Sequence, residues 1–333
     1  MNEDTSQLGG SGGERARRPI KIAHSPDADD AFMFYALFGG KVEGLSLPIE
    51  EVREDIETLN QKAREGAYEV TAVSIHAYPY IADKYLLLTT GGCFGEGYGP
   101  IIVASKPLKP RQLLKVRIGI PGKLTSAFLA LKLYEQHLAG EGRSGMCYSQ
   151  APFDQLIDKV VEGKLDAALL IHEGQLNYMD KGLHKIADLG EWWKKETGLP
   201  LPLGGIAIRR DLAPELMKKI GDAICASVQY GLDPAHKDEV MAHALPFARG
   251  LDAEKAAQFV GLYVNDFTVD FGRKGLKAIR SFLDLGWRRG LVSLKTNWDD
   301  TFFDVRRGKI RHAVVDEEIK VEESTSEEVI ASV

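Results

Sequence analysis

The sequence predicts an α/β fold of two lobes, in which one lobe is inserted into the other. Short apolar runs typical of buried strands alternate with amphipathic segments typical of helices over much of the chain. A strand at residues 99–104 leads into a second α/β series, and a strand at residues 204–209 leads back out of it. Two connections of this kind imply a cleft between the lobes, which hinge motion can close over a ligand.

The individual elements follow from hydrophobic periodicity and from helix start and stop signals. We expect strands at residues 19–24, 45–51, 70–75, 85–89, 101–104, 167–171 and 204–210, and a second strand–helix series that starts with residues 116–122. Helices are expected at residues 31–37, 55–63, 123–138 and 153–162, and then at 215–230, 237–247, 253–263 and 274–289. The pattern predicts a flexible leader (1–18), an outer lobe (19–104 and 205–312), an inserted lobe (105–204) and an acidic disordered tail (313–333).

Composition narrows the class of protein. The chain has 333 residues, of which 44% are hydrophobic and 27% charged, as in soluble globular proteins. A formal net charge of -6 argues against a nucleic-acid partner. No apolar run reaches the length of a membrane span, and no secretory signal is recognisable. Three widely spaced cysteines without a CxxC pair indicate neither a disulfide framework nor a metal site, so we expect a cytoplasmic protein.

The strongest candidate for chemistry is His172. It follows a run of five apolar residues, 167–171, that reads as a buried strand of a parallel sheet. Residues just past the carboxyl end of such a strand face the crevice where open α/β sheets bind ligands. Histidine has an unperturbed pKa nearest neutrality, so it can take a proton there. The alternative is a strand-end histidine that only hydrogen-bonds a carbonyl group.

Other strand and helix ends offer candidate ligand groups. Ser25, Asp27 and Asp29 occupy the first strand–helix turn, where capping of the helix is the competing role. Ser74 lies near the carboxyl end of the third strand. The helix expected at residue 125 would present free N–H groups and a positive dipole end, which favour a substrate carboxylate. The segment 263–270, which carries Asn265, interrupts the helical run and is expected to return near the cleft.

Several blocks together resemble a known enzyme family. They are SPDADDAFMFYAL, EDIETLNQKAREG, GPIIVAS, IPGKLTSAFLALKLY, LLIHEGQLNY, DLGEWWKKETGLPLPLGGIAIRRDL and YVNDFTVD, within residues 20–287. In these blocks the chain resembles the 1,4-dihydroxy-6-naphthoate synthase family of the futalosine route to menaquinone. The resemblance implies a two-lobed, periplasmic-binding-protein-like fold of type 2 in a cytoplasmic enzyme.

The resemblance also implies a reaction. The family converts cyclic dehypoxanthinyl futalosine to 1,4-dihydroxy-6-naphthoate and releases a sugar-derived fragment, as a carbon–carbon lyase without a cofactor. The family's strand-end histidine, its proposed base, matches His172. We expect a small-molecule substrate, no metal, no nucleic-acid or membrane partner, and a monomer or homodimer. The expected substrate-binding residues are Ala72, Val73, Ser74, Thr125, Ser126, Ala127, Asp29 and Asn265.

The chain departs from the family pattern at three positions, of which two, 29 and 72, are among the expected substrate-binding residues. Asp29 stands where the family has asparagine, Ala31 where it has threonine, and Ala72 where it has lysine. Two of these changes predict a more acidic cleft. Two other functions remain open: a sister enzyme similar to chorismate dehydratase, and a solute-binding protein of a transporter. The LPLPLGG and WW segments favour the synthase over the sister enzyme, and the lack of a recognisable export signal argues against the transporter.

Overall fold

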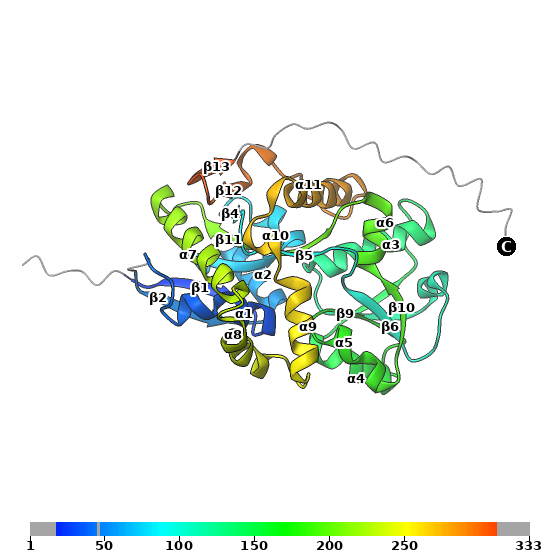
Figure 1. Ribbon diagram of the computed structural model, residues 1–333. Helices are drawn as coiled ribbons and strands as arrows, with labels where there is room; N and C mark the ends of the chain where they lie inside the picture. The colour runs from blue at the N-terminus through cyan, green and yellow to red at the C-terminus, as the bar shows by residue number, and fades with distance from the viewer. Residues whose placement is uncertain (1–17, 45–46, 312–333) are drawn as a thin grey trace, which may run out of the picture.

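The computed structural model describes residues 18–44 and 47–311 and contains two β-sheets flanked by helices (Figure 1). The expected leader and tail lie almost entirely outside the described residues. The strands are β1 (Ile20–His24), β2 (Ile49–Arg53), β3 (Val70–Ser74), β4 (Tyr85–Leu88), β5 (Cys93–Gly95), β6 (Ile101–Ala104), β7 (Arg117–Ile120), β8 (Cys147–Gln150), β9 (Ala167–Leu170), β10 (His184–Asp188), β11 (Leu201–Arg209), β12 (Phe302–Asp304) and β13 (Lys309–Arg311).

Helices make up most of the remaining described chain. The α-helices are α1 (Ala28–Phe38), α2 (Ile56–Glu65), α3 (Ser126–Ala139), α4 (Leu156–Val161), α5 (Gly174–Asn177), α6 (Leu189–Thr197), α7 (Pro214–Leu232), α8 (Lys237–Ala244), α9 (Ala253–Tyr263), α10 (Asp266–Val269) and α11 (Gly272–Arg288). The 3₁₀ helices are η1 (Ile75–Tyr80), η2 (Pro110–Lys115), η3 (Phe153–Gln155), η4 (Tyr178–Lys181), η5 (Leu245–Phe247) and η6 (Trp298–Asp300).

The first sheet brings two candidate ligand positions to one edge. Its order is β13-β12-β4-β11-β3-β1-β2, and β5 also pairs with β11. Because β1 is parallel to both β2 and β3, the carboxyl ends of β1 and β3 lie at the same edge of the sheet. Ser25 follows β1, and Ser74 is the last residue of β3. We call the part of the chain built on this sheet the first lobe.

The second sheet has the order β10-β6-β9-β7-β8 and forms the core of the second lobe. β7 is parallel to both β8 and β9, so Ile120 and Leu170 end at the same edge. We expected β6 to be the last strand of the outer lobe, but it pairs antiparallel with β9 and β10. Its run of four apolar residues fits a buried strand of either sheet, so the sequence could not assign it. The exact bounds of the lobes remain a prediction.

The sequence accounts for the local starts and ends of the helices that border the cleft. Asp55 caps α2 by accepting from the N–H groups of Glu57 and Thr58, and Gly66, with φ 73°, ends that helix. Thr125 caps α3 by accepting from the N–H of Phe128. In Figure 1, α9 stands between the two lobes. An ion pair at 2.9 Å joins Lys255 on α9 to Asp180 of the second lobe.

A buried carboxylate, Glu135, organises the edge of the second lobe. It lies on α3 with no exposed side-chain surface. It accepts from the N–H groups of Gly145 and Met146 at 2.8 and 2.7 Å and from the Tyr148 hydroxyl at 2.8 Å. Lys132 also donates to it. Burial alone would raise the pKa of Glu135, but these donors outweigh burial and hold the pKa below its ordinary value. Glu135 thereby fixes the chain that leads into β8.

Within residues 18–44 and 47–311, no helix is both long enough and apolar enough to cross a membrane.

Candidate active site

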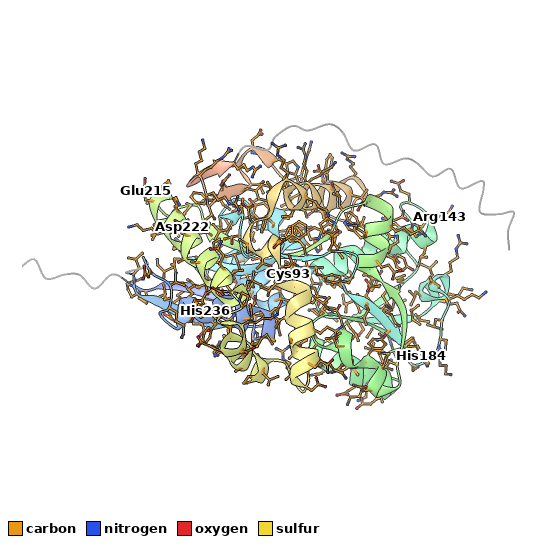
Figure 2. The ribbon with its side chains drawn as sticks, in the orientation of Figure 1. Cys93, Arg143, His184, Glu215, Asp222 and His236 are labelled. Atoms are coloured by element: carbon orange, nitrogen blue, oxygen red, sulfur yellow. The ribbon has the colours of Figure 1, made fainter. Side chains whose placement is uncertain are left out.

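A cavity lies where the two lobes meet. Its wall combines the carboxyl ends of β1, β3 and β9, the N-terminus of α3, the middle of β11 and the face of α9. Figure 2 shows Cys93, which contributes to this wall, near the centre of the molecule beside α9. The lining residues are Ser25, Asp27, Asp29, Asp30, Met33, Ile56, Ala72, Val73, Ser74, Gly91, Cys93, Pro100, Thr125, Ser126, Ala127, Ile171, His172, Gln175, Leu203, Gly204, Gly205, Ile206, Phe259 and Tyr263.

The structure brings together nearly all residues expected at the site. His172, Asp29, the 72–74 segment and the 125–127 segment all line the cavity. Asn265 does not belong to this wall. Its side chain caps α10, where it accepts from the N–H of Phe267 at 3.0 Å and donates to the Leu262 carbonyl at 3.1 Å. A substrate-binding role for Asn265 therefore has no geometric support.

His172 lies two residues past the end of β9, directly after the apolar run 167–171. Its φ of 58° places it in the left-handed region, which is uncommon for a residue other than glycine. The imidazole is 16% exposed and its Nδ1 lies 3.0 Å from Oδ2 of Asp27. Phe153 packs edge-on against the ring with centroids 4.8 Å apart. Strained backbone of this kind is common at functional sites, where the surrounding contacts hold it.

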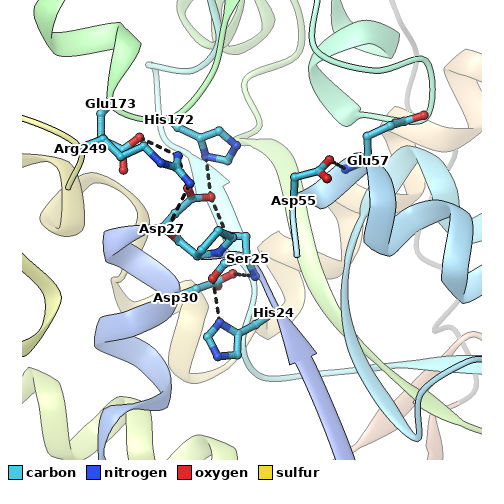
Figure 3. Close-up of polar contacts among 10 residues, drawn as sticks. His24, Ser25, Asp27, Asp30, Asp55, Glu57, His172, Glu173 and Arg249 are labelled. Atoms are coloured by element: carbon cyan, nitrogen blue, oxygen red, sulfur yellow. Dashed lines mark hydrogen bonds and ion pairs between the residues drawn. The ribbon is translucent and has the colours of Figure 1, made fainter. Parts of the chain in front are cut away.

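Asp27 is the centre of a buried polar cluster (Figure 3). It occupies the N-cap position of α1, but its side chain makes no capping hydrogen bond. Instead Oδ2 accepts from the Ser25 hydroxyl at 2.5 Å and faces His172. Arg249 lies 2.6 Å from Oδ1 and also approaches Glu173 at 3.4 Å. The capping role that competes with ligand binding at this turn is therefore wrong for Asp27.

Three further carboxyl groups surround this cluster. Burial, followed by the charges of Asp30, Asp27 and Glu173, raises the pKa of Asp29 well above its ordinary value. Burial also raises the pKa of Asp30, and burial together with the Asp27 charge raises the pKa of Glu173. These shifts favour the neutral acid form. Asp29 therefore adds less negative charge to the cleft than its sequence suggests.

The hydroxyl of Ser74 remains free to donate. Asn60 is fully buried and holds Ser74 from both sides, since its Nδ2 donates to Oγ at 3.0 Å and its Oδ1 accepts from the Ser74 N–H at 2.8 Å. In the part of the chain that the structure describes, the Ser74 hydroxyl proton has no acceptor. A ligand in the cavity can supply that acceptor.

The hydroxyl of Ser126, in contrast, is already committed. It donates to the Leu203 carbonyl at 2.5 Å and accepts from the N–H of His76 at 3.1 Å. These contacts join α3 of the second lobe to β11 and η1 of the first. The N–H groups of Ser126 and Ala127 have no acceptor within the described ranges, so the start of α3 offers two free amide donors to the cavity.

Gln175 and Cys93 of the wall, and Arg249 beside the Asp27 carboxylate, were not predicted from the sequence, whereas Tyr263 belongs to the segment 263–270 that was expected near the cleft. Gln175 and Tyr263 contact each other across the two lobes. With its amide oxygen oriented toward the backbone of His172, Gln175 accepts from the backbone N–H of His172 at 3.2 Å and from the Tyr263 hydroxyl at 2.8 Å. Arg249 comes from the loop before α9, where no strand end or helix start marks it. Cys93 lies on β5, in the glycine-rich segment 90–100. Among residues 18–44 and 47–311, no group of acids, histidines and cysteines is arranged to hold a metal ion.

The fold and the cavity between its lobes define a class, the periplasmic-binding-protein-like proteins of two lobes. The periplasmic aliphatic sulphonate-binding protein of Escherichia coli has this fold: it superposes with a TM-score of 0.61 at 12% identity, covering 90% of this chain and 94% of that protein. A crystal structure of a protein from Archaeoglobus fulgidus superposes with a TM-score of 0.76 at 43% identity, covering 82% and 98%. The predicted fold class is confirmed.

Sequence comparison gives the family. The menaquinone-biosynthesis family matches residues 20–287. A 1,4-dihydroxy-6-naphthoate synthase of Thermus thermophilus is 38% identical over 274 residues, covering 82% of this chain and 96% of the relative. A synthase of the same name from Streptomyces coelicolor is 37% identical over 278 residues, covering 82% and 94%. The chain belongs to the menaquinone-biosynthesis family and is an enzyme of that pathway.

Proposed function

We propose that this enzyme is a carbon–carbon lyase that converts cyclic dehypoxanthinyl futalosine to 1,4-dihydroxy-6-naphthoate, with His172 as the base. One observation carries the assignment of the base. His172 lies in the cavity wall with Nδ1 directed to Asp27, and within residues 18–44 and 47–311 its Nε2 has no hydrogen-bond partner. The free nitrogen is available to a ligand. The two relatives are named for the product, 1,4-dihydroxy-6-naphthoate, and the proposed substrate is the one that the resemblance to the synthase family implies.

The proposed reaction needs little more than this base. Nε2 of His172 removes a proton from an acidic C–H of the spirocyclic substrate. The electron pair left on carbon forms a C=C bond while the C–C bond to the sugar-derived fragment breaks. The fragment leaves with the electron pair of the broken bond and takes up the proton held by His172, and the remaining ring becomes aromatic. Enclosure between two lobes excludes water from the charged intermediate, which strengthens its polar contacts. Proton transfer by a positioned side chain contributes about 10²–10⁴-fold to such a rate.

The distribution of charge in the cavity indicates how the substrate lies. We propose that its carboxylate binds the free N–H groups of Ser126 and Ala127, at the positive end of the α3 dipole. Its sugar-derived part then faces His172 and Asp29 in the same cavity. The raised pKa of Asp29 favours a neutral carboxyl group, which can donate to a hydroxyl or carbonyl oxygen without repelling an anion.

Ser74→Ala is expected to raise KM by roughly 2–10-fold and to leave kcat nearly unchanged, because one hydrogen bond to a ligand is worth about 0.5–1.5 kcal/mol. Steady-state kinetics on the purified variant measures both constants. The matched control is Ser281→Ala on α11, whose hydroxyl bonds only its own helix at Lys277. An unchanged KM in Ser74→Ala would remove Ser74 from the substrate-binding set.

Genetic complementation distinguishes this function from that of the sister enzyme. The gene is introduced into two futalosine-pathway strains, one lacking the naphthoate synthase and one lacking chorismate dehydratase. We expect menaquinone to return only in the first strain. Rescue of the second strain alone would overturn the proposal and assign the sister reaction. Rescue of neither strain, with the protein present at normal levels, would indicate another ligand.

We further propose that the enzyme works in the cytoplasm, as a monomer or homodimer. All three cysteines are free, and Cys147 is exposed, a state that a reducing compartment maintains. Cell fractionation with immunodetection tests the compartment. Recovery with exported proteins would contradict it.

A further inference from the structure

We propose that Asp27 is a positioning residue for His172, so that the base on one lobe is completed by a carboxylate from the other lobe. The inference rests on the proposed role of His172 as base. It assigns a function to the polar cluster around Asp27 that the reaction described above does not use.

The Asp27 carboxylate is buried and is held by two groups, one at each oxygen. Its side chain is only 1% exposed. The Ser25 hydroxyl donates to Oδ2 at 2.5 Å, and Arg249 approaches Oδ1 at 2.6 Å. Arg249 supplies the opposite charge that a buried carboxylate requires. Its guanidinium group is itself held 4.5 Å above the ring of Phe153 and donates to the Pro26 carbonyl at 3.2 Å.

A carboxylate so fixed determines which nitrogen of His172 carries the proton. Asp27 Oδ2 lies 3.0 Å from Nδ1, and an ionised carboxylate can only accept. The neutral imidazole is therefore held with its proton on Nδ1, which leaves the lone pair on Nε2 for the substrate. Phe153 touches both ends of the arrangement, since its ring also packs against the imidazole. Figure 3 shows the chain of contacts from Arg249 through Asp27 to His172.

The two members of this pair come from different lobes. Asp27 follows β1 of the first sheet, and His172 follows β9 of the second. The ion pair between Arg249 and Glu173 also joins the two lobes. Arg249 lies in the loop before α9, and Glu173 directly follows His172 in the second lobe. Hinge opening of the lobes would separate His172 from Asp27. Orientation of the base is thereby linked to closure over the substrate.

The test compares Asp27→Asn with the wild type in two independent measurements. The first is the ¹⁵N–¹H correlation spectrum of the histidine rings at about pH 8.5, where free imidazole is neutral. The His172 signals are identified by their absence in His172→Asn. The second is steady-state kinetics with cyclic dehypoxanthinyl futalosine. The control is Asp252→Asn, the same chemical change at the N-cap of α9, where the amide oxygen can still accept from Lys255 N–H.

We expect the wild-type spectrum to show His172 with its proton on Nδ1 and the Asp27→Asn spectrum to lose that state. We expect kcat of Asp27→Asn to fall by about 10²–10⁴-fold with KM within about threefold, as when an orienting carboxylate is removed from a histidine base. Asp252→Asn should match the wild type in both measurements. Wild-type kcat in Asp27→Asn, or a wild-type His172 with its proton on Nε2, would overturn the inference. If the wild type makes no naphthoate, the proposed function fails, and the spectra alone decide the role of Asp27.

Discussion

His172→Asn is expected to lower kcat by about 10²–10⁴-fold while the fold and the affinity for substrate are retained. Asparagine has no group that accepts a proton near neutral pH, so the elimination loses its base. It is also the substitution that the backbone best tolerates, because His172 has a φ of 58° and asparagine is enriched in the left-handed region. Turnover is measured by the absorbance of the naphthoate product, and binding by calorimetry.

The matched control for this variant is His184→Asn. His184 is an exposed histidine of β10 in the same lobe, and it lies at the edge of the molecule in Figure 2. We expect the His184→Asn variant to have the kcat of the wild type. Equal kcat in His172→Asn and His184→Asn would end the assignment of His172 as base, whatever the substrate affinity.

Glu135→Ala is expected to lower the free energy of unfolding by about 3–5 kcal/mol. The substitution leaves the buried N–H groups of Gly145 and Met146 and the Tyr148 hydroxyl without their acceptor. It also removes the partner of Lys132, a side chain that is itself largely buried. Urea unfolding followed by circular dichroism measures the change in free energy.

The same network predicts a pH dependence. Because the pKa of Glu135 is lowered in the folded protein, the contribution of its charge to stability is complete above the ordinary value of 4.5 and is lost as pH falls below it. The difference in unfolding free energy between wild type and Glu135→Ala should therefore shrink in acid.

The control variant is Glu141→Ala, which removes an exposed carboxylate close by in the sequence. It should lower the free energy of unfolding only slightly. A Glu135→Ala protein as stable as this control would contradict the account.

The sequence predicts those features of the site that local patterns encode. A run of apolar residues followed by an ionisable pair correctly places His172 past the end of a buried strand. The hydroxyl-rich stretch before residue 128 correctly places a helix start, with Thr125 as its cap. Both signals lie within a few residues of the feature that they predict, so no knowledge of the tertiary fold is needed.

The contact partners of these residues depend on the tertiary fold, so they could not be predicted from the sequence. Asp27 has the sequence context of a helix cap, but its side chain bonds Ser25 and Arg249 and faces His172 of the second lobe, contacts that no local pattern reveals. Arg249 reaches the same carboxylate from the loop before α9, far along the chain, with no local signal. For Asn265 the local signal was real but structural, since the side chain caps α10 instead of facing the cavity.

One assay of product formation tests the proposed reaction most directly. Purified protein is incubated with cyclic dehypoxanthinyl futalosine, without added metal or cofactor, and formation of 1,4-dihydroxy-6-naphthoate is followed by its ultraviolet absorbance. The account predicts product in the wild type and its near disappearance in His172→Asn. A folded wild-type protein that binds the compound and forms no naphthoate would contradict it.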